Sequence, residues 1–207
     1  MKNLIIAPHA DDEVLAVGGT VEKYLERGEE VELIICGIRK HDSNEQRKRA
    51  TKHYTNTHQL PYNDEEYYSA FNFILGSVES IYNRVRPDVV FIPNRDDFNQ
   101  DHKCIYEICE IVTRRYQEHA PNKILMYETP SSTTQSFNNN FKCNYYEQLH
   151  LKHVNAKIAT MSEYENEMRA FPNPRSKLGL MTYANFRGME CGTEYAEGFN
   201  LIYQRSG

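Results

Sequence analysis

Two kinds of hydrophobic pattern alternate along the first half of the chain. Short apolar runs typical of buried strands occupy residues 3–7, 31–36, 88–93 and 124–127. Apolar residues recur at helical spacing over residues 12–27, 67–85 and 105–112, and the polar stretch 43–58 is expected to be an exposed helix. Gly28 and Pro87 stand where glycine and proline end helices.

The alternation of strands and helices predicts a Rossmann-like α/β fold, with an open, mainly parallel sheet and helices on both faces. The chain has 207 residues, so a single domain spanning residues 1–207 is expected. Ligands bind such sheets beyond the carboxyl ends of the strands, where the strand order reverses. A ligand site is therefore expected in the loops of residues 8–13, 37–44, 94–102 and 128–136.

The first of these loops concentrates charge in a few residues. It reads PHADDE over residues 8–13 and leads from a predicted strand directly into a predicted helix. Acidic residues suit a helix N-terminus, but capping needs only one carboxylate and does not explain His9. Mutual repulsion makes three adjacent carboxylates costly unless a cation neutralises them. The loop is therefore a candidate cation site.

The loop after the third predicted strand has a similar composition and an equivalent position. It reads RDDFNQDH over residues 95–102 and precedes another predicted helix. Taken alone, His102 is typical of a surface or capping histidine. Taken together, the two loops bring two histidines and several carboxylates to one edge of the sheet.

Imidazole and carboxylate groups together are the ligands of a catalytic zinc, whose three protein ligands leave one position open for water. Zinc lowers the pKa of that water to about 7, and a carboxylate that is not a ligand can act as general base. His9, Asp12 and His102 can supply the ligands, with Asp11 left as the base. Spacing alone does not distinguish Asp11 from Asp12 in these two roles.

With these loops, the sequence resembles the PIG-L/LmbE-like family of zinc-dependent de-N-acetylases, which remove acyl groups from N-acylated sugars. The family motif P-H-x-D-D-E is matched by residues 8–13, and its later D-H pair by Asp101-His102. Residues 127–133, YETPSST, resemble a stretch found in one branch of the family. Arg187-Gly188 and the YAEGF of residues 195–199 resemble its C-terminal ending. The resemblance covers essentially the whole chain.

The resemblance implies a metal-dependent hydrolase. It implies His9, Asp12 and His102 as metal ligands, with Zn2+ as cofactor and Fe2+ as an alternative. It implies Asp11 as the general base, which takes a proton from the water that attacks the amide carbonyl. The substrate would be a small molecule with an N-acetyl or similar acyl group: an amino sugar, a nucleotide-sugar or a glycoside.

One position departs from the family pattern. Many members have a histidine that stabilises the oxyanion or acts as acid where this chain has Asn99. Asparagine can donate a hydrogen bond to an oxyanion, worth about 2.7–4 kcal/mol, but it cannot deliver a proton. Either Asp11 serves as both base and acid, which we favour, or another group protonates the amine. Asp11, Asn99 and Asp101 are the predicted catalytic residues.

Three residues in the second half of the chain are candidates for substrate contacts. Glu128 follows the fourth predicted strand, where it either holds sugar hydroxyls or pairs with an arginine. Glu197, in a segment rich in aromatic residues, is a candidate sugar contact. The Arg187 guanidinium either holds an anionic group such as phosphate or pairs with a nearby glutamate.

The composition narrows the class of function. With 24 Lys and Arg against 29 Asp and Glu, the net charge is -5, so a nucleic-acid partner is not expected. No apolar run reaches the roughly 20 residues of a membrane span. The five cysteines are odd in number and include no CxxC pair, which favours reduced thiols and a cytoplasmic protein.

Two rival functions remain open. A phosphoesterase could use the same acids, usually with two metals about 3.5–4 Å apart. A catalytically silent module that binds a sugar or nucleotide is the other rival, because fold alone does not determine function. No G-x-G-x-x-G follows the first strand, so a dinucleotide is not expected. The sequence leaves open which sugar is bound and whether the chain forms a homo-oligomer.

Overall fold

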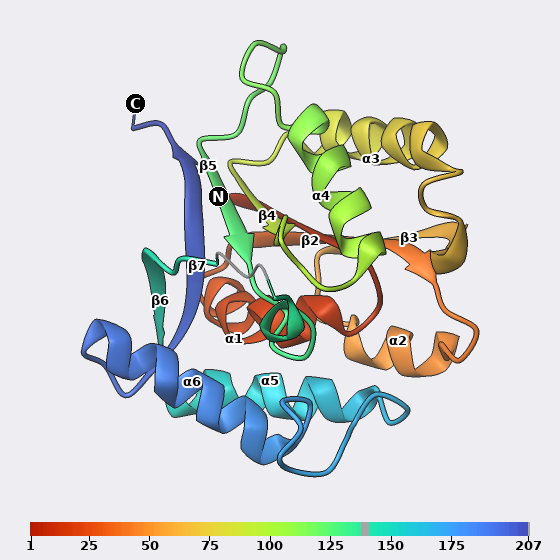
Figure 1. The fold of residues 1–207 in the computed structure, drawn as a ribbon. Helices are drawn as coiled ribbons and strands as arrows, with labels where there is room; N and C mark the ends of the chain where they lie inside the picture. Colours follow the sequence, from red (N-terminus) through yellow and green to blue (C-terminus); the bar gives the residue numbers. More distant parts are fainter. Residues whose placement is uncertain (138–140, 207) are drawn as a thin grey trace.

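The computed structural model describes residues 1–137 and 141–206, and it contains a seven-stranded sheet with helices on both faces (Figure 1). The strands are β1 (Lys2–Ala7), β2 (Glu30–Ile38), β3 (Asn56–Asn63), β4 (Val89–Pro93), β5 (Lys123–Tyr127), β6 (Tyr145–Leu149) and β7 (Tyr195–Gln204). Their order across the sheet is β3-β2-β1-β4-β5-β7-β6. The first five are parallel, whereas β7 runs antiparallel to β5 and β6. The predicted fold class is confirmed.

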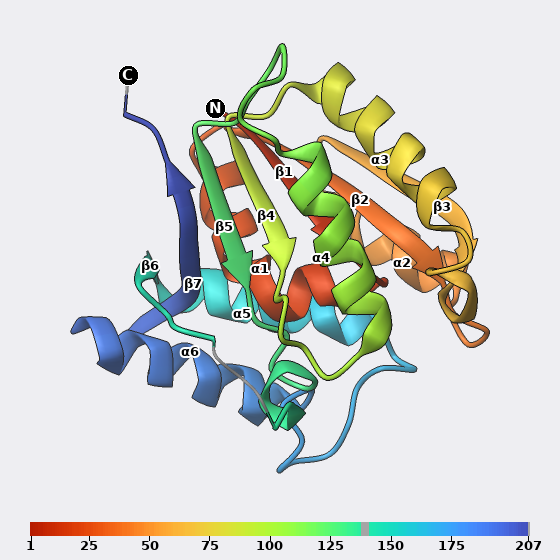
Figure 2. The ribbon, with the colours of Figure 1, turned by 45° about the horizontal axis from the view of Figure 1, so that its top comes forward.

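The helices form the outer layers of the fold. They are α1 (Asp12–Glu26), α2 (Asn44–Ala50), α3 (Phe71–Val85), α4 (Gln100–Val112), α5 (Leu151–Glu163) and α6 (Lys177–Cys191), with 3-10 turns η1 (Asp64–Glu66) and η2 (Thr133–Gln135). Helices α3 and α4 cover one face of the sheet, and α1 covers the other, with α5 packed outside it (Figures 1 and 2). None of the helices in the described ranges is long and apolar enough to cross a membrane.

In the first half of the chain, the structure differs from the predicted elements in two places. The predicted helix over residues 43–58 is wrong in its second half, because α2 ends at Ala50 and β3 begins at Asn56. Pairing with β2 along the sheet edge overrides the local sequence preference there. Helix α3 begins at Phe71, later than its apolar stripe predicts, because residues 67–70 form turns after the 3-10 helix of residues 64–66.

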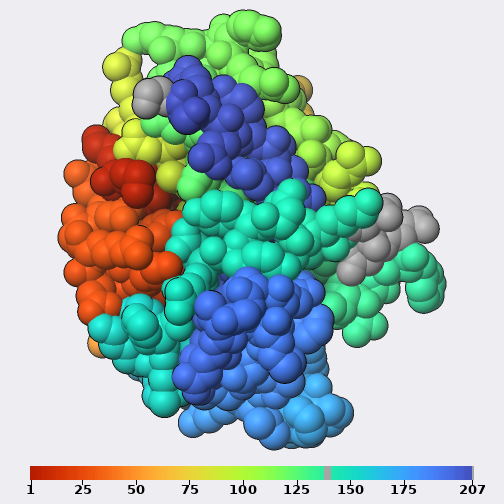
Figure 3. Space-filling model, turned by 90° about the vertical axis from the view of Figure 1, so that its left-hand side faces the viewer, coloured from red at the N-terminus to blue at the C-terminus, as the bar shows by residue number. Residues whose placement is uncertain are grey.

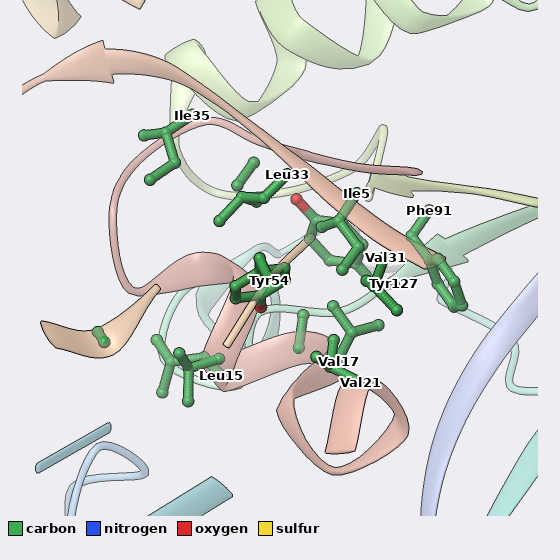
Figure 4. Close-up of a cluster of buried hydrophobic side chains, with 14 of the residues drawn as sticks. Ile5, Leu15, Val17, Val21, Val31, Leu33, Ile35, Tyr54, Phe91 and Tyr127 are labelled. Carbon is green, nitrogen blue, oxygen red and sulfur yellow. The ribbon is translucent and has the colours of Figure 1, made fainter. Parts of the chain in front are cut away.

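Alternating side chains of the central strands build two hydrophobic cores. On β1, Ile5 and Ala7 face α1, whereas Leu4 and Ile6 belong to the core beneath α3 and α4. Figure 4 shows the first of these cores, where side chains of the sheet meet those of α1. Nearly every side chain of β1 and β4 is buried, which explains why both strands appear in the sequence as continuous apolar runs.

The strand order reverses between β1 and β4. Strands β2 and β3 lie on one side of β1, whereas β4 and β5 lie on the other. The connections that leave β1 and β4 therefore lead to helices on opposite faces, α1 and α4. A crevice opens between two such connections, beyond the carboxyl ends of the strands. The two charged loops, residues 8–13 and 94–102, meet at this switch point.

The C-terminal part of the chain builds one end of the sheet. Figure 3 shows this end, with the segments coloured teal and blue packed together. The hydrophobic pattern assigns no element after residue 127, yet β6, α5, α6 and β7 all lie there. Helix α6 exposes Phe186 and Met189 on its outer surface, which obscures the amphipathic pattern that would otherwise reveal it.

Gly37 lies against Tyr67 near the carboxyl end of β2. The Tyr67 hydroxyl donates a hydrogen bond to the carbonyl oxygen of Pro8 at 2.6 Å, and a Cβ at residue 37 would meet that hydroxyl at 2.0 Å. Gly37→Ala should therefore cost about 1–3 kcal/mol of unfolding free energy in urea denaturation. The control, Gly76→Ala on the exposed side of α3, has open space at its Cβ position and should stabilise by about 0.5–1 kcal/mol. A Gly37→Ala protein as stable as wild type would contradict this contact.

Candidate metal centre

Three buried side chains converge at the switch point of the sheet. His9 follows β1, Asp12 begins α1, and His102 lies in the first turn of α4. The Oδ2 atom of Asp12 lies 3.3 Å from Nδ1 of His9 and 3.2 Å from Nε2 of His102. All three residues are at most 4% exposed. The structure therefore brings together the three predicted metal ligands from two separate loops.

Each histidine presents its other ring nitrogen to a second carboxylate. Nε2 of His9 lies 2.6 Å from Oδ2 of Asp101, and Nδ1 of His102 lies 3.5 Å from Oδ1 of Asp97. Asp97 also accepts hydrogen bonds from two hydroxyl groups of the loop after β5, at 3.0 and 2.6 Å. Metal-binding histidines usually have such carboxylate partners, which fix the orientation and tautomer of the ring.

The charges of this cluster favour a cation. Burial lowers the pKa of His9, but the carboxylates of Asp101 and Asp12 outweigh burial and raise it to about 9. Burial also lowers the pKa of His102, yet Asp12 and Asp97 raise it well above its usual value. Burial raises the pKa of Asp12, whereas the two histidines bring it well below its usual range. The carboxylates therefore attract positive charge to this position, and a divalent cation would compete with the ring protons of the two histidines for it.

The positions of the donor atoms fit a divalent metal. Ligand atoms arranged tetrahedrally at zinc distances of roughly 2.0–2.2 Å lie about 3.3–3.6 Å from one another. The separations from Asp12 to the two imidazole nitrogens, 3.3 and 3.2 Å, are close to that range. One donor atom from each of His9, Asp12 and His102 lies within 4.8 Å of the others. Two imidazoles and one carboxylate leave a fourth position open, as catalytic zinc sites do.

Asp11 precedes α1 and is fully buried next to these residues. Its backbone has φ 108°, a left-handed conformation that is uncommon for a residue with a side chain. The Asp11 N–H donates a hydrogen bond to Oε2 of Glu13 at 2.9 Å, and the Tyr164 hydroxyl donates to Oε1 of Glu13 at 2.6 Å. Glu13, the third carboxylate of the motif, therefore stabilises the strained turn that carries Asp11.

Two arginines flank the Asp11 carboxylate. Nη2 of Arg39 lies 3.3 Å from Oδ1, and Nη1 of Arg175 lies 3.2 Å from Oδ2. Burial raises the pKa of Asp11, the two arginines lower it, and the neighbouring Asp12 and Glu167 raise it again, to about 6. A carboxyl group whose pKa is raised toward neutrality in this way is suited to take up and release a proton.

Asn99 and Asp101 lie next to the three clustered residues. Asn99 occupies the position before α4, and its Nδ2 atom lies 3.5 Å from Nε2 of His102. An amide at this position can donate a hydrogen bond toward a molecule bound at the centre. Asp101 lies in the first turn of α4 and contacts His9, so its position suits orienting that ring.

The three predicted substrate contacts, Glu128, Arg187 and Glu197, lie together in a hollow that the candidate metal ligands do not line. Nε of Arg187 donates to Oε1 of Glu128 at 2.7 Å, and its Nη1 donates to Oε2 of Glu190 at 2.6 Å. Oε1 of Glu197 accepts a hydrogen bond from Nζ of Lys157 at 2.6 Å. The cavity in this hollow measures about 20 Å3, room for about one water molecule. These charged groups pair within the protein, and their contact with substrate stays a prediction.

Four charged residues around the candidate base and ligands were not expected from the sequence. Asp97 and Arg39 lie in loops that follow predicted strands. The sequence therefore predicts their place at this edge of the sheet but gives no sign of their contacts. Glu167 and Arg175 come from the connection between α5 and α6, where no motif or periodic pattern indicates a function. Only the packing of that connection against the switch point brings them to Asp11.

The fold is shared with solved structures of different activity. The chain is similar to N,N'-diacetylchitobiose deacetylase from Pyrococcus horikoshii, with 19% identity and a TM-score of 0.76 over 97% of this chain and 83% of that one. It is similar to the conserved protein TT1542 from Thermus thermophilus, with 18% identity, a TM-score of 0.77, and 99% and 96% covered. It also resembles GalB, the 4-carboxy-2-hydroxymuconate hydratase from Pseudomonas putida KT2440, with 15% identity, a TM-score of 0.73, and 100% and 98% covered. These likenesses show the fold alone. No curated protein matches the sequence.

The sequence matches a family model more directly. The model described as PIG-L, GlcNAc-PI de-N-acetylase, matches residues 4–113, which is more than half of the 207 residues. The match covers most of β1, all of β4 and both loops that meet at the switch point. The resemblance seen in the sequence motifs is therefore confirmed, and this chain belongs to the PIG-L (GlcNAc-PI de-N-acetylase) family.

Proposed function

We propose that this protein is a metal-dependent hydrolase that removes an N-acetyl or similar small acyl group from an amino sugar or sugar conjugate. The observation that carries the proposal is the convergence of His9, Asp12 and His102 beside the buried carboxylate of Asp11. Membership in the PIG-L family supports this class of reaction. The fold shared with the chitobiose deacetylase from Pyrococcus horikoshii agrees with it.

The substrate would bind in a hollow beside Asp101. The lining of this hollow includes Asp64, Tyr68, Ser69 and Gln100. Carboxylate, hydroxyl and amide groups suit the hydroxyls of a sugar, and the Tyr68 ring, which is 51% exposed, offers an apolar face. Because Asp101 also contacts a candidate metal ligand, a sugar in this hollow could place its acyl group at the cluster.

His9, Asp12 and His102 would hold the metal, which we propose to be Zn2+, with Fe2+ as the alternative because imidazole binds both. A bound metal of this kind polarises an amide carbonyl and lowers the pKa of water to about 7. Asp11 would take a proton from the attacking water and, once protonated, give it to the departing amine. Asn99 would donate a hydrogen bond to the developing oxyanion, as its position next to His102 allows.

Replacing one candidate ligand should remove the metal. His102→Ala takes away one of three donors, so we expect the metal affinity to fall by more than about 100-fold. This loss exceeds the one typical of removing a residue that only hydrogen-bonds to a metal ligand. Titration calorimetry with zinc measures the affinity, and elemental analysis measures the metal retained after dialysis. His53→Ala is the control, because this partly exposed histidine lies outside the cluster and contacts Glu22. Equal metal content in the two variants would exclude His102 from the ligands.

The reaction itself is tested with a panel of N-acetylated sugars, nucleotide-sugars and glycosides, with free amine and acetate both measured. We expect equal amounts of the two products from at least one substrate, and loss of both on adding a chelator. Phosphate release with two bound metals would instead favour a phosphoesterase, and sugar binding without acetate release would favour a silent module. Two further groups of possible ligands lie near the centre. His9, Asp64 and Asp101 share His9 with the first group, whereas His41, Asp42 and Glu167 suit a second metal poorly, because Arg39 pairs with both of their carboxylates.

A further inference from the structure

A segment outside the family match reaches the candidate base. Arg175 lies in the connection between α5 and α6, beyond residues 4–113. Its Nη1 atom lies 3.2 Å from Oδ2 of Asp11, and its Nε atom donates a hydrogen bond to Oγ of Ser131 at 3.0 Å. The side chain of Arg175 is 18% exposed and that of Asp11 is fully buried. Solvent ions therefore screen this contact little.

Arg39 approaches the other oxygen of the same carboxylate. Its Nη2 atom lies 3.3 Å from Oδ1 of Asp11. The buried carboxylate of Glu167 lies between the two arginines, 3.3 Å from Nη2 of Arg39 and in contact with Nη1 of Arg175. Glu167 therefore holds both guanidinium groups next to Asp11.

The contact with Arg175 leaves Asp11 able to accept a proton. Within the described ranges, no group is aligned to donate a hydrogen bond to Oδ2 of Asp11. Arg175 attracts this oxygen by its charge and does not occupy a lone pair. A general base needs both properties, because it must be held in one orientation and must still take up a proton.

We propose that Arg175 is a positioning residue that holds the Asp11 carboxylate in its reactive orientation. The inference rests on the proposed role of Asp11 as the base. The planar guanidinium contacts Asp11, Glu167 and Ser131 at the same time, which the compact ammonium of a lysine does not reproduce. The C-terminal segment thereby completes a catalytic site whose other parts come from the N-terminal half.

Arg175→Ala should lower kcat by about 100-fold, the effect typical of a misplaced catalytic group. KM should stay within about twofold, because no contact with substrate is lost. The metal content should not change, and added guanidinium ion should restore part of kcat. Arg169→Ala is the matched control: Arg169 lies in the same segment and is 3.9 Å from Glu167, so its loss should leave kcat at the wild-type value.

A second measurement tests the contact without any substrate. In urea denaturation, Arg175→Ala should reduce the folding equilibrium constant at least about threefold more in the wild-type background than in an Asp11→Asn background, where only its contacts with Glu167 and Ser131 are lost. Equal reductions in both backgrounds would overturn the proposed contact. A raised KM with unchanged kcat, or an unchanged kcat, would overturn the positioning role. A wild-type protein without turnover would instead count against the proposed function, while the denaturation cycle would still decide on the contact.

Discussion

Asp11→Asn should lower turnover by about 10²–10⁴-fold while the protein still binds one metal ion. General-base catalysis typically contributes this much, and an amide of nearly the same shape cannot accept the proton. The metal should remain, because the donor atoms that converge belong to His9, Asp12 and His102. Acetate release measures the turnover, and elemental analysis of the same sample measures the metal.

Two further variants make this prediction specific. Asp96→Asn changes a carboxylate in the loop after β4 that pairs with Arg95, and it should keep turnover within about twofold. Asp12→Asn should lose metal and turnover together. Full turnover in Asp11→Asn would refute the base assignment, whereas loss of metal in that variant would make Asp11 a ligand.

The largest effect on stability should come from removing Lys157. Lys157 on α5 and Glu197 on β7 form a buried ion pair at 2.6 Å. Glu197 accepts hydrogen bonds from the N–H groups of Gly19 and Thr20 inside α1, at 2.9 and 2.7 Å. Lys157 donates to the carbonyl of Leu15 at 2.9 Å, the group that the Gly19 N–H would bind in a regular helix. The pair therefore joins α1, α5 and β7.

Lys157→Met should cost about 3–5 kcal/mol of unfolding free energy, because it leaves the Glu197 carboxylate buried without its cation. Urea denaturation measures the change. Lys152→Met on the same helix is the matched control: its pair with Glu26 is exposed, so the unfolding free energy should hardly change. Adding Glu197→Gln to Lys157→Met should recover part of the loss. A cost below about 1 kcal/mol for Lys157→Met would contradict the account of this pair.

The position of the candidate metal centre could be predicted because its residues lie directly after strands that are easy to recognise. Strands β1 and β4 are buried on both faces, so each appears as an unbroken apolar run. The rule that sites form at the carboxyl ends of parallel strands then selects the loops of His9 and His102. The pairing of β1 with β4 supplies the proximity that the sequence alone leaves open.

Long-range packing explains what could not be predicted. Glu197 is of a residue type that often contacts sugars, yet its oxygens accept hydrogen bonds from backbone N–H groups of α1, which lie more than 170 positions away in the sequence. Arg175 lies in a connection without any periodic pattern, and only the packing of α5 against α1, with α6 against α5, brings it to Asp11. Neither contact can be predicted from the local sequence, since each joins segments far apart along the chain.

Anomalous diffraction from crystals grown with zinc would locate the metal ion among these side chains. We expect one strong peak per chain, at roughly 2.0–2.2 Å from His9, Asp12 and His102, with the Asp11 carboxylate close by and not bound to the ion. A peak held by other residues, or no peak between the two imidazoles at saturating zinc, would contradict it.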